Sequence, residues 1–253
     1  MTDARDGGLR AVFLAAGFGT RMYPLTRDKA KPLLEVGGAP LLTRLVQQVE
    51  ACNHVSDGVV VANGRFHADF VQWRETLGAH LSLTLVNDGV TDDQAPLGAI
   101  RDLQLALREA PQRDVSGHVV VAGDNLFDFD LAPFEERFLA SGRGQLMLRH
   151  IPEPVPPKRY NEVTIDAKGR VTSFREKPTQ PKTNLAAIAV YFLPAELPGL
   201  LDEYLASGAH HDAPGYLMEW LHQRVPMEGS LFEGTWFDIG NKESFAEARA
   251  AFA

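Results

Sequence analysis

The sequence predicts an α/β protein built on a doubly wound, mostly parallel mixed sheet. Two observations predict this fold. In the first half of the chain, short apolar runs typical of buried strands alternate with segments of helical spacing. Such alternation places parallel strands in one sheet with helices on both faces. The chain is also 253 residues long and 45% hydrophobic, which is enough for one large domain or two small ones.

The elements of the first half follow from their patterns. Leu9–Ala16 is an apolar run with Arg10 as its only charge, which is typical of a buried strand. Pro40–Cys52 carries apolar residues at helical spacing after an initial proline, so it predicts a helix. The same reasoning predicts further strands at 58–62, 81–86 and 118–122, and further helices at 66–77 and 97–110.

The pattern changes after Phe134. Strands are predicted at 145–151 and 184–193, a hairpin at 162–165 and 171–175, and helices at 196–206, 215–225 and 242–252. Residues 152–157 include four prolines and predict a loop. No segment has the composition of a linker, so we predict a single domain over residues 1–253. Its halves are approximately residues 1–134 and 135–253.

Charge and cysteine content limit the function classes. The net charge is −8, which does not support a basic surface for nucleic acid. The lone Cys52 excludes an internal disulfide. The first residues are polar, and the apolar run after them is too short for a secretory signal or a membrane span. We therefore expect a cytoplasmic enzyme that binds neither nucleic acid nor membrane.

A glycine-rich turn follows the first predicted strand. Gly17 and Gly19 allow backbone N–H groups to approach a ligand and form an anion-binding nest, and Arg21 and Lys31 add positive charge. This combination suits a triphosphate, although two glycines after a strand also make an ordinary turn. A P-loop is excluded, and Met22 stands where a dinucleotide-binding motif needs its third glycine.

The same residues carry a family resemblance. Leu14-Ala-Ala-Gly-Phe-Gly-Thr-Arg21, with Pro24-Leu-Thr26 and Lys31-Pro-Leu-Leu34, resembles the signature of the sugar-phosphate nucleotidyltransferases, which include glucose-1-phosphate thymidylyltransferases and uridylyltransferases. These enzymes join a nucleoside triphosphate to a sugar 1-phosphate. The resemblance extends from Leu14 to about Ala248. One departure is Ala30, where the family usually has Pro or Ser.

The resemblance implies a Rossmann-like nucleotidyltransferase fold with a small sugar-binding β subdomain. Residues 1–134 would then be the nucleotide-binding half and residues 135–253 the sugar-phosphate-binding half. The first motif would bind the nucleotide through Leu14, Ala15, Ala16, Gly17, Gly19, Thr20 and Arg21. We expect its turn and the turn after Ala122 to face one cleft, because both follow carboxyl ends of strands.

Two acidic residues are candidate metal ligands. Asp124 follows a predicted buried strand, where a carboxylate can hold Mg²⁺, although Gly-Asp-Asn is also strong turn chemistry. The segment resembles the metal-binding Gly-Asp-Asn of the family. Asp238 lies in Trp236-Phe-Asp-Ile-Gly240, which resembles the segment of the second metal ligand. Its alternative role is to cap the following helix, but Asn241 is the better cap.

The sugar-phosphate site is expected around Glu176 and Lys177, which follow the second strand of the hairpin. Lys177 would neutralise the sugar phosphate and Glu176 would accept hydrogen bonds from sugar hydroxyls; the alternative is a solvated charge pair. The segment from Arg175 to Ala186 resembles the family's Glu-Lys-Pro segment and its continuation. Asn125 and Asn184 are assigned to substrate binding on the same resemblance.

The loop at 86–98 is expected to contact the base, since Gly98 matches a family glycine next to it. Thymidylyltransferases of the family place Gln five residues before this glycine, where this chain has Asp93, with Gln94 next to it. We include Asp93 and Gln94 among the nucleotide-binding residues, but the departure weakens the case for thymine. His210, His211 and Asp212 could be metal ligands, yet a surface loop before Ala213 is the preferred interpretation.

The expected reaction is attack of the sugar-phosphate oxygen on the α-phosphorus with release of pyrophosphate. Mg²⁺ would be held on Asp124 and Asp238, and Arg21, Lys31, Asp124 and Lys177 would be the catalytic residues. UTP or dTTP is the favoured nucleotide. One alternative is a CTP-dependent cytidylyltransferase for phosphocholine or another small phosphorylated or phosphonate acceptor. Another is a non-catalytic nucleotide-sensing protein. A homo-oligomer is possible, but no surface patch indicates one.

Overall fold

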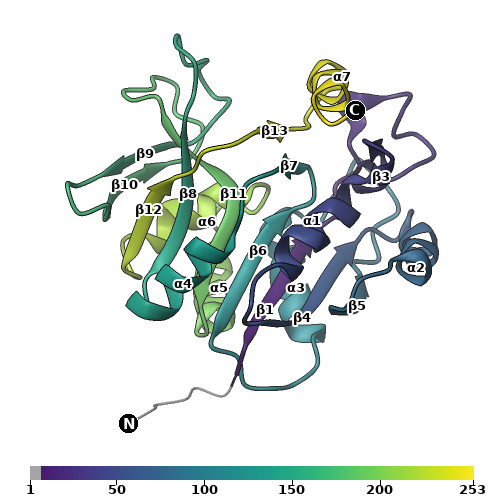
Figure 1. The fold of residues 1–253 in the computed structure, drawn as a ribbon, viewed down its shortest axis with the longest axis horizontal. Helices are drawn as coiled ribbons and strands as arrows, with labels where there is room; N and C mark the ends of the chain where they lie inside the picture. The colour runs from purple at the N-terminus through teal and green to yellow at the C-terminus, as the bar shows by residue number, and fades with distance from the viewer. Residues whose placement is uncertain (1–6) are drawn as a thin grey trace.

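The computed structural model describes residues 7–253 (Figure 1). A seven-stranded sheet lies at its centre. Its strand order is β12 (Met227–Leu231), β8 (Gly144–His150), β11 (Leu185–Pro194), β6 (Gly117–Ala122), β1 (Leu9–Leu14), β4 (Val55–Ala62) and β5 (Ser82–Asn87). β11 is antiparallel to β6 and β8, and the other neighbouring pairs are parallel. The predicted mostly parallel mixed sheet is confirmed.

Helices cover both faces of this sheet. One face is covered by α1 (Leu41–Glu50), α2 (His67–Thr76) and α4 (Ala132–Ser141), and the other by α3 (Ala99–Glu109), α5 (Leu197–Ala206) and α6 (Pro214–Leu221). Strand β1 shows why its sequence is apolar throughout. Phe13 packs into the core on the first face and Val12 into the core on the second, and both are fully buried.

The remaining elements are short. The hairpin β9 (Glu162–Ile165) and β10 (Val171–Arg175) has the predicted bounds. Two small antiparallel pairs join β7 (Asn125–Phe127) to β13 (Trp236–Asp238), and β2 (Glu35–Val36) to β3 (Ala39–Pro40). The last helix is α7 (Lys242–Ala251), and Thr20–Met22 and Lys31–Leu33 form single 3₁₀ turns.

The register of β1 brings two turns together. Leu14 at its end lies opposite Ala122 at the end of β6 and Val61 near the end of β4. The chain segments that follow β1 and β6 therefore leave the sheet side by side at its carboxyl edge.

Helix α7 packs against a segment that is distant from it in the sequence. Figure 1 shows it next to the early segment that follows β1. Met22 and Leu34 from that segment form one buried cluster with Phe245 and Ala248 of α7. The Asn241 side chain accepts a hydrogen bond from the Ser244 backbone N–H at 2.8 Å, so Asn241 is the helix cap, as predicted. Within residues 7–253, no helix combines the length and apolarity that crossing a membrane requires.

Six strands and helices were missed in the sequence analysis, and one predicted helix was several residues too long. The missed elements are β2, β3, β7, α4, β12 and β13. Three-residue strands such as β7 and β13 carry no periodicity of their own, because they exist through pairing with each other. The predicted helix 215–225 ends at Leu221, and the backbone of Arg224 and Val225 turns back onto the Leu221 carbonyl.

Candidate active site

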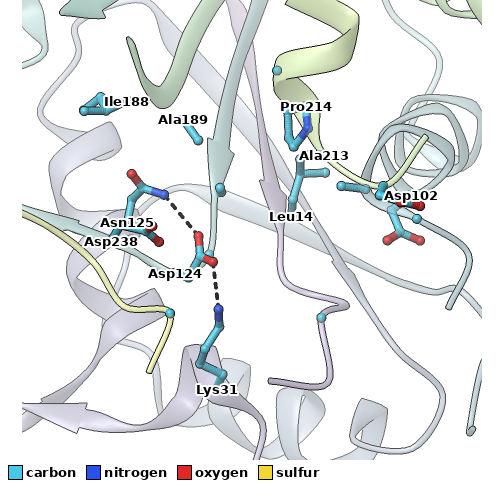
Figure 2. A pocket seen from close by; sticks show the side chains of 18 of the residues that line it. Leu14, Lys31, Asp102, Asp124, Asn125, Ile188, Ala189, Ala213, Pro214 and Asp238 are labelled. Atoms are coloured by element: carbon cyan, nitrogen blue, oxygen red, sulfur yellow. Dashed lines mark hydrogen bonds and ion pairs between the residues drawn. The ribbon is translucent and has the colours of Figure 1, made fainter. Parts of the chain in front are cut away.

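A cavity of about 610 Å³ opens at the carboxyl edge of the sheet, and Figure 2 shows part of its lining. Both the turn after β1 and the turn after β6 line it, which confirms the expectation of one shared cleft. Most of the predicted site residues line this cavity: Leu14, Ala15, Ala16, Gly17, Arg21, Lys31, Gly98, Asp124, Asn125, Glu176, Lys177 and Asp238.

Asp124 lies just beyond the end of β6 and pairs with Lys31. The Lys31 Nζ donates to Asp124 Oδ2 at 2.7 Å, and the Asn125 amide donates to Oδ1 at 3.1 Å (Figure 2). Burial alone would raise the pKa of Asp124, but the charge of Lys31 and these hydrogen bonds hold that pKa below its usual value. Asp124 is therefore an ionised carboxylate facing the cavity.

Asp238 reaches the same place through the pairing of β13 with β7. Asp238 lies opposite Asn125 in this pair, and the Ile239 N–H donates to the Asp124 carbonyl at 2.9 Å. Asp238 is exposed and lines the cavity. Partial desolvation of the carboxyl, and then the negative charge of Asp124, raise the pKa of Asp238 to about 6.

The carboxylates of Asp124 and Asp238 are suitable ligands for a hard divalent cation. They repel each other, and a cation between them would relieve that repulsion. No cluster of three or more His, Cys, Asp or Glu ligands exists among residues 7–253. Mg²⁺ needs no such cluster, because it is commonly held by one or two carboxylates together with substrate phosphates and water.

Asn125 is fixed from two sides. Its amide donates to Asp124, and its Oδ1 accepts a hydrogen bond from Trp236 Nε1 at 2.7 Å. The Arg149 guanidinium lies 5.5 Å from the centre of the Trp236 ring. The Asn125 side chain thus links β7, which Asp124 directly precedes, to β13, which ends at Asp238.

The glycine-rich turn has the open backbone that the sequence predicted. A side chain at Gly17 would meet nothing within 4 Å, and Gly19 has a φ of +64°, which favours glycine. The Thr26 hydroxyl donates to the Gly19 carbonyl at 2.7 Å and closes the turn. Arg21 lies against Gly240, which follows Asp238 by two residues, so its guanidinium stands at the carboxylate pair.

Glu176 and Lys177 line the opposite wall of the cavity, beyond β10. The Glu176 side chain is only 7% exposed and lies 3.6 Å from the Lys177 Nζ. Burial raises the pKa of Glu176, and Lys177 offsets part of this effect. A Cβ at position 215 would overlap the Glu176 carboxylate, so glycine at this position leaves room for that side chain as it lies. The predicted alternative of a solvated pair does not hold for Glu176.

Lys177 has a left-handed backbone with φ of 47°, and Lys158 has φ of 57°. They are the non-glycine residues with positive φ among residues 7–253, and both line the cavity. The Lys158 N–H donates to the Pro178 carbonyl at 3.0 Å, which joins the two segments. Strained backbone of this kind concentrates at functional sites, because the surrounding structure must hold it.

The other predicted residues lie outside the cavity lining. Gly19 and Thr20 form the turn beneath it. Asp93 accepts a hydrogen bond from the Tyr23 hydroxyl at 2.8 Å, and Gln94 is exposed. Asn184 lies 3.0 Å from His150 Nδ1.

Sequence analysis missed several parts of the cavity lining, among them Ala187–Ala189 of β11 and Ala213–Gly215 at the start of α6. Two missed parts bring charged side chains. One is the segment Lys158–Asn161, which brings Lys158 and Arg159 into the lining after the proline-rich loop, and the other is Asp102 in α3. Asp102 lies one helical turn before the buried Ala106, so it belongs to the apolar face of α3. A charged residue on an apolar helix face is unusual, and this position could have identified Asp102 from the sequence.

The segment His210–Asp212 packs against the start of α3. The His211 carbonyl accepts the Ile100 N–H at 3.0 Å, and a Cβ at position 98 would overlap His211. His211 Nδ1 lies 3.8 Å from Asp212. The segment has no helix or strand, as expected for a loop, but Asp212 lines the cavity.

Comparison with known proteins identifies the family to which the chain belongs. The family model described as nucleotidyl transferase matches residues 10–253. The chain is 28% identical over 251 residues to the mannose-1-phosphate guanylyltransferase catalytic subunit beta of Xenopus tropicalis, covering 94% of this chain and 62% of that protein. It is 24% identical over 242 residues to the glucose-1-phosphate thymidylyltransferase of Streptomyces antibioticus, covering 94% and 65%.

Solved structures agree on the fold. The UTP-bound UGPase of Acinetobacter baumannii superposes with a TM-score of 0.75 at 20% identity, covering 96% of this chain and 93% of that one. At this identity the likeness concerns the fold alone. The chain spans 53 to 65% of the length of the curated relatives that it matches.

Proposed function

The chain belongs to the nucleotidyl transferase family, and we propose that it joins a nucleoside triphosphate to a sugar 1-phosphate, giving a nucleoside diphosphate sugar and pyrophosphate. UTP or dTTP is the proposed nucleotide. The observation that carries the proposal is that Lys31, Asp124 and Asp238 line the same cavity as the glycine-rich turn. This grouping offers both a cation site and a separate positive charge for phosphate.

The triphosphate binds, in this proposal, over the turn after β1. The backbone from Leu14 to Gly19 accommodates phosphate oxygens, and the close approach of the two turns supports this arrangement: a Cβ at Gly123 would lie 2.8 Å from the Leu14 carbonyl. Thr20 would shape the turn. Arg21 and Lys31 neutralise the phosphates, and Arg21 can donate two parallel hydrogen bonds.

Mg²⁺ would be held by Asp124 and Asp238. When bound there, it would neutralise phosphate charge and polarise the phosphoryl oxygens. The chain's own contribution is to keep both carboxylates in place through the β7–β13 pair, and to keep Asp124 ionised through Lys31.

The sugar phosphate would approach from the opposite wall. Lys177 neutralises its phosphate, and the buried Glu176 carboxylate accepts hydrogen bonds from sugar hydroxyls. Arg159, which lines the cavity and acts on the charge of Asp238, adds a second cation on this side. Asn125 completes the proposed substrate-binding set from the cavity wall, whereas Asn184, which lies outside the lining, contacts His150.

The reaction needs no covalent intermediate on the protein. The sugar-phosphate oxygen is already an anion near neutral pH, so no strong general base is required. It attacks the α-phosphorus, the bond to the bridging oxygen breaks, and pyrophosphate leaves. The barrier is the approach of two polyanions, which the cations on both walls lower by positioning and charge neutralisation.

The test is pyrophosphate release with Mg²⁺ across UTP, dTTP, CTP, GTP and ATP against several sugar 1-phosphates and phosphocholine. Release with a sugar 1-phosphate is expected, and Asp124→Asn should lower turnover by about 10²- to 10³-fold. Asp202→Asn is the control, because Asp202 is exposed on α5 and outside the cavity. Release only with CTP and a non-sugar acceptor would replace the proposal by the cytidylyltransferase. Nucleotide binding without any release would favour a sensing protein.

A further inference from the structure

Asp102 is a buried acid in the first turns of α3. Its backbone N–H donates to the Gly98 carbonyl at 2.9 Å, and the residue is 7% exposed. Its side chain lines the cavity together with Gly98 and Ala99. Neither carboxyl oxygen has a hydrogen-bond partner within residues 7–253, and Oδ1 is fully buried.

No hydrogen bond within residues 7–253 stabilises this buried carboxyl oxygen. The neighbouring helix positions Ile100, Leu103 and Ala106 are fully or almost fully buried and apolar, so an apolar residue would suit the core better. Asp102 does not cap the helix, because the Ile100 N–H at the start of α3 donates to the His211 carbonyl instead. A buried polar group without a partner calls for an explanation, and a ligand that fills the cavity supplies one.

The location of Asp102 points to the base of the nucleotide. In Figure 2, Leu14 lies between Asp102 on one side and Asp124 with Lys31 on the other. The triphosphate, in the proposed function, occupies the side of Lys31. The part of the cavity next to Asp102 is lined largely by apolar side chains and backbone, from Leu14, Pro96, Leu97, Gly98 and Ala99, which suits a flat aromatic ring.

Asp88 and Asp212 also line the cavity. The Asp212 side chain is 78% exposed and lies 3.8 Å from His211 Nδ1, and Asp88 is already engaged in hydrogen bonds. Its Oδ1 accepts hydrogen bonds from the Val90 N–H at 2.7 Å and from the Gly64 N–H at 3.1 Å. These bonds hold the turn after β5. Asp102 is therefore the acid at this end whose oxygens, within the described chain, remain unpaired.

Resting on the proposed function, we propose that Asp102 binds the nucleobase, donating from a protonated carboxyl to a base carbonyl and accepting from the adjacent ring N–H. A protonated carboxyl offers one donor beside one acceptor, which complements the N3–H and neighbouring carbonyl of uracil or thymine. The pairing makes Asp102 a determinant of base binding that acts apart from the phosphate chemistry.

The surroundings favour the protonated form. Burial, and then the charge of Asp88, raise the pKa of Asp102 to about 7, and no cation contributes to this shift. A bound triphosphate adds further negative charge to the cavity. An ionised carboxylate, which only accepts, would instead suit the adjacent N1–H and N2–H donors of guanine.

Calorimetry with two probes tests this proposal. UTP or dTTP reports on the whole nucleotide, and inorganic tripolyphosphate reports on the phosphate site without a base. Asp102→Ala should weaken nucleotide binding about ten- to thirtyfold, the loss of two hydrogen bonds, and leave tripolyphosphate binding unchanged. Asp102→Asn should stay within about threefold of wild type, because a carboxamide keeps one donor and one acceptor. Asp202→Ala is the surface control.

A methylated nucleotide gives a test without a variant. N3-methyl-UTP lacks the N–H, so it should bind the wild type about tenfold more weakly than UTP and lose nothing further in Asp102→Ala. Unchanged UTP affinity in Asp102→Ala, or an equal loss for tripolyphosphate, would overturn the base contact. A preference for GTP that Asp102→Asn abolishes would overturn the assignment to uracil or thymine. Base-dependent binding without pyrophosphate release would refute the proposed reaction and leave this inference standing.

Discussion

The Lys31 ammonium lies 2.7 Å from Asp124 Oδ2, so a positive and a negative group of the candidate active site hold each other in place. The Lys31 side chain is 11% exposed and that of Asp124 is 29% exposed, which limits the screening of their attraction by solvent. Lys31 thus both keeps Asp124 ionised and presents charge to the cavity.

Lys31→Met should lower turnover by about 10²- to 10³-fold, because it removes the charge that faces the phosphates and leaves Asp124 less firmly ionised. Steady-state pyrophosphate release is the measurement. Lys29→Met is a suitable control, since Lys29 makes only an exposed pair with Glu35 at 3.7 Å. Turnover of Lys31→Met close to wild type would remove Lys31 from the catalytic set.

Mg²⁺ binding should weaken as the pH falls through about 6. Burial and the neighbouring Asp124 raise the pKa of Asp238 to about 6, and the carboxyl must lose its proton to hold a cation. Affinity at pH 5 should be about tenfold lower than at pH 7.5. Calorimetric Mg²⁺ titrations at both values measure this, and Asp238→Asn should remove the difference. Equal affinities in the wild type would show that Asp238 is not a ligand.

Asp102 should make the protein less stable as the pH rises. Its pKa is raised in the folded state to about 7, so folding favours the protonated form. Its contribution to stability is fully present below pH 4 and is lost between about pH 4 and 7, a difference of about 4 kcal/mol. Asp102→Ala should flatten this slope and unfold at higher denaturant than wild type at pH 8. If the difference between the urea midpoints of wild type and Asp102→Ala stayed constant from pH 4 to 8, the prediction would be contradicted.

Gly215→Ala should disturb the sugar-phosphate wall alone. The added methyl would overlap the Glu176 carboxylate, which must then move together with the adjacent Lys177. We expect KM for the sugar 1-phosphate to rise about tenfold, the cost of about one charged hydrogen bond, while nucleotide affinity stays constant. Gly199→Ala is the matched control, because it lies in α5 with open space around it. A weaker nucleotide affinity in Gly215→Ala would contradict this prediction.

The sequence predicted the parts of the fold that have a strong local signal. The β1 run and the hairpin at 162–175 were found because burial on two faces and a tight turn each leave a clear pattern. β7 and β13 were not, since each is three residues long and depends on a partner distant in the chain. Asp124, directly before β7, and Asp238, at the end of β13, were each found through a motif, but their shared location required the pairing.

The same distinction holds for the cavity. Asp124 and Lys177 stand in conspicuous motifs, whereas Asp102 is one charge within a helix and Arg159 follows a loop with no regular pattern. Conversely, Asp93 and Asn184 stood near motifs, but the structure turns them toward Tyr23 and His150. Side-chain direction in loops is set by tertiary contacts that periodicity does not encode.

The pairing of β13 with β7 also has a consequence for synthesis. Asp238 cannot meet Asp124 until the ribosome has released the segment that forms β13, and α7 must then dock on Met22 and Leu34 to cover that segment. A nascent chain with its sheet already assembled would still lack half of the carboxylate pair. The two carboxylates therefore come together only after every strand of the central sheet has been translated, because β13 follows all of them in the chain.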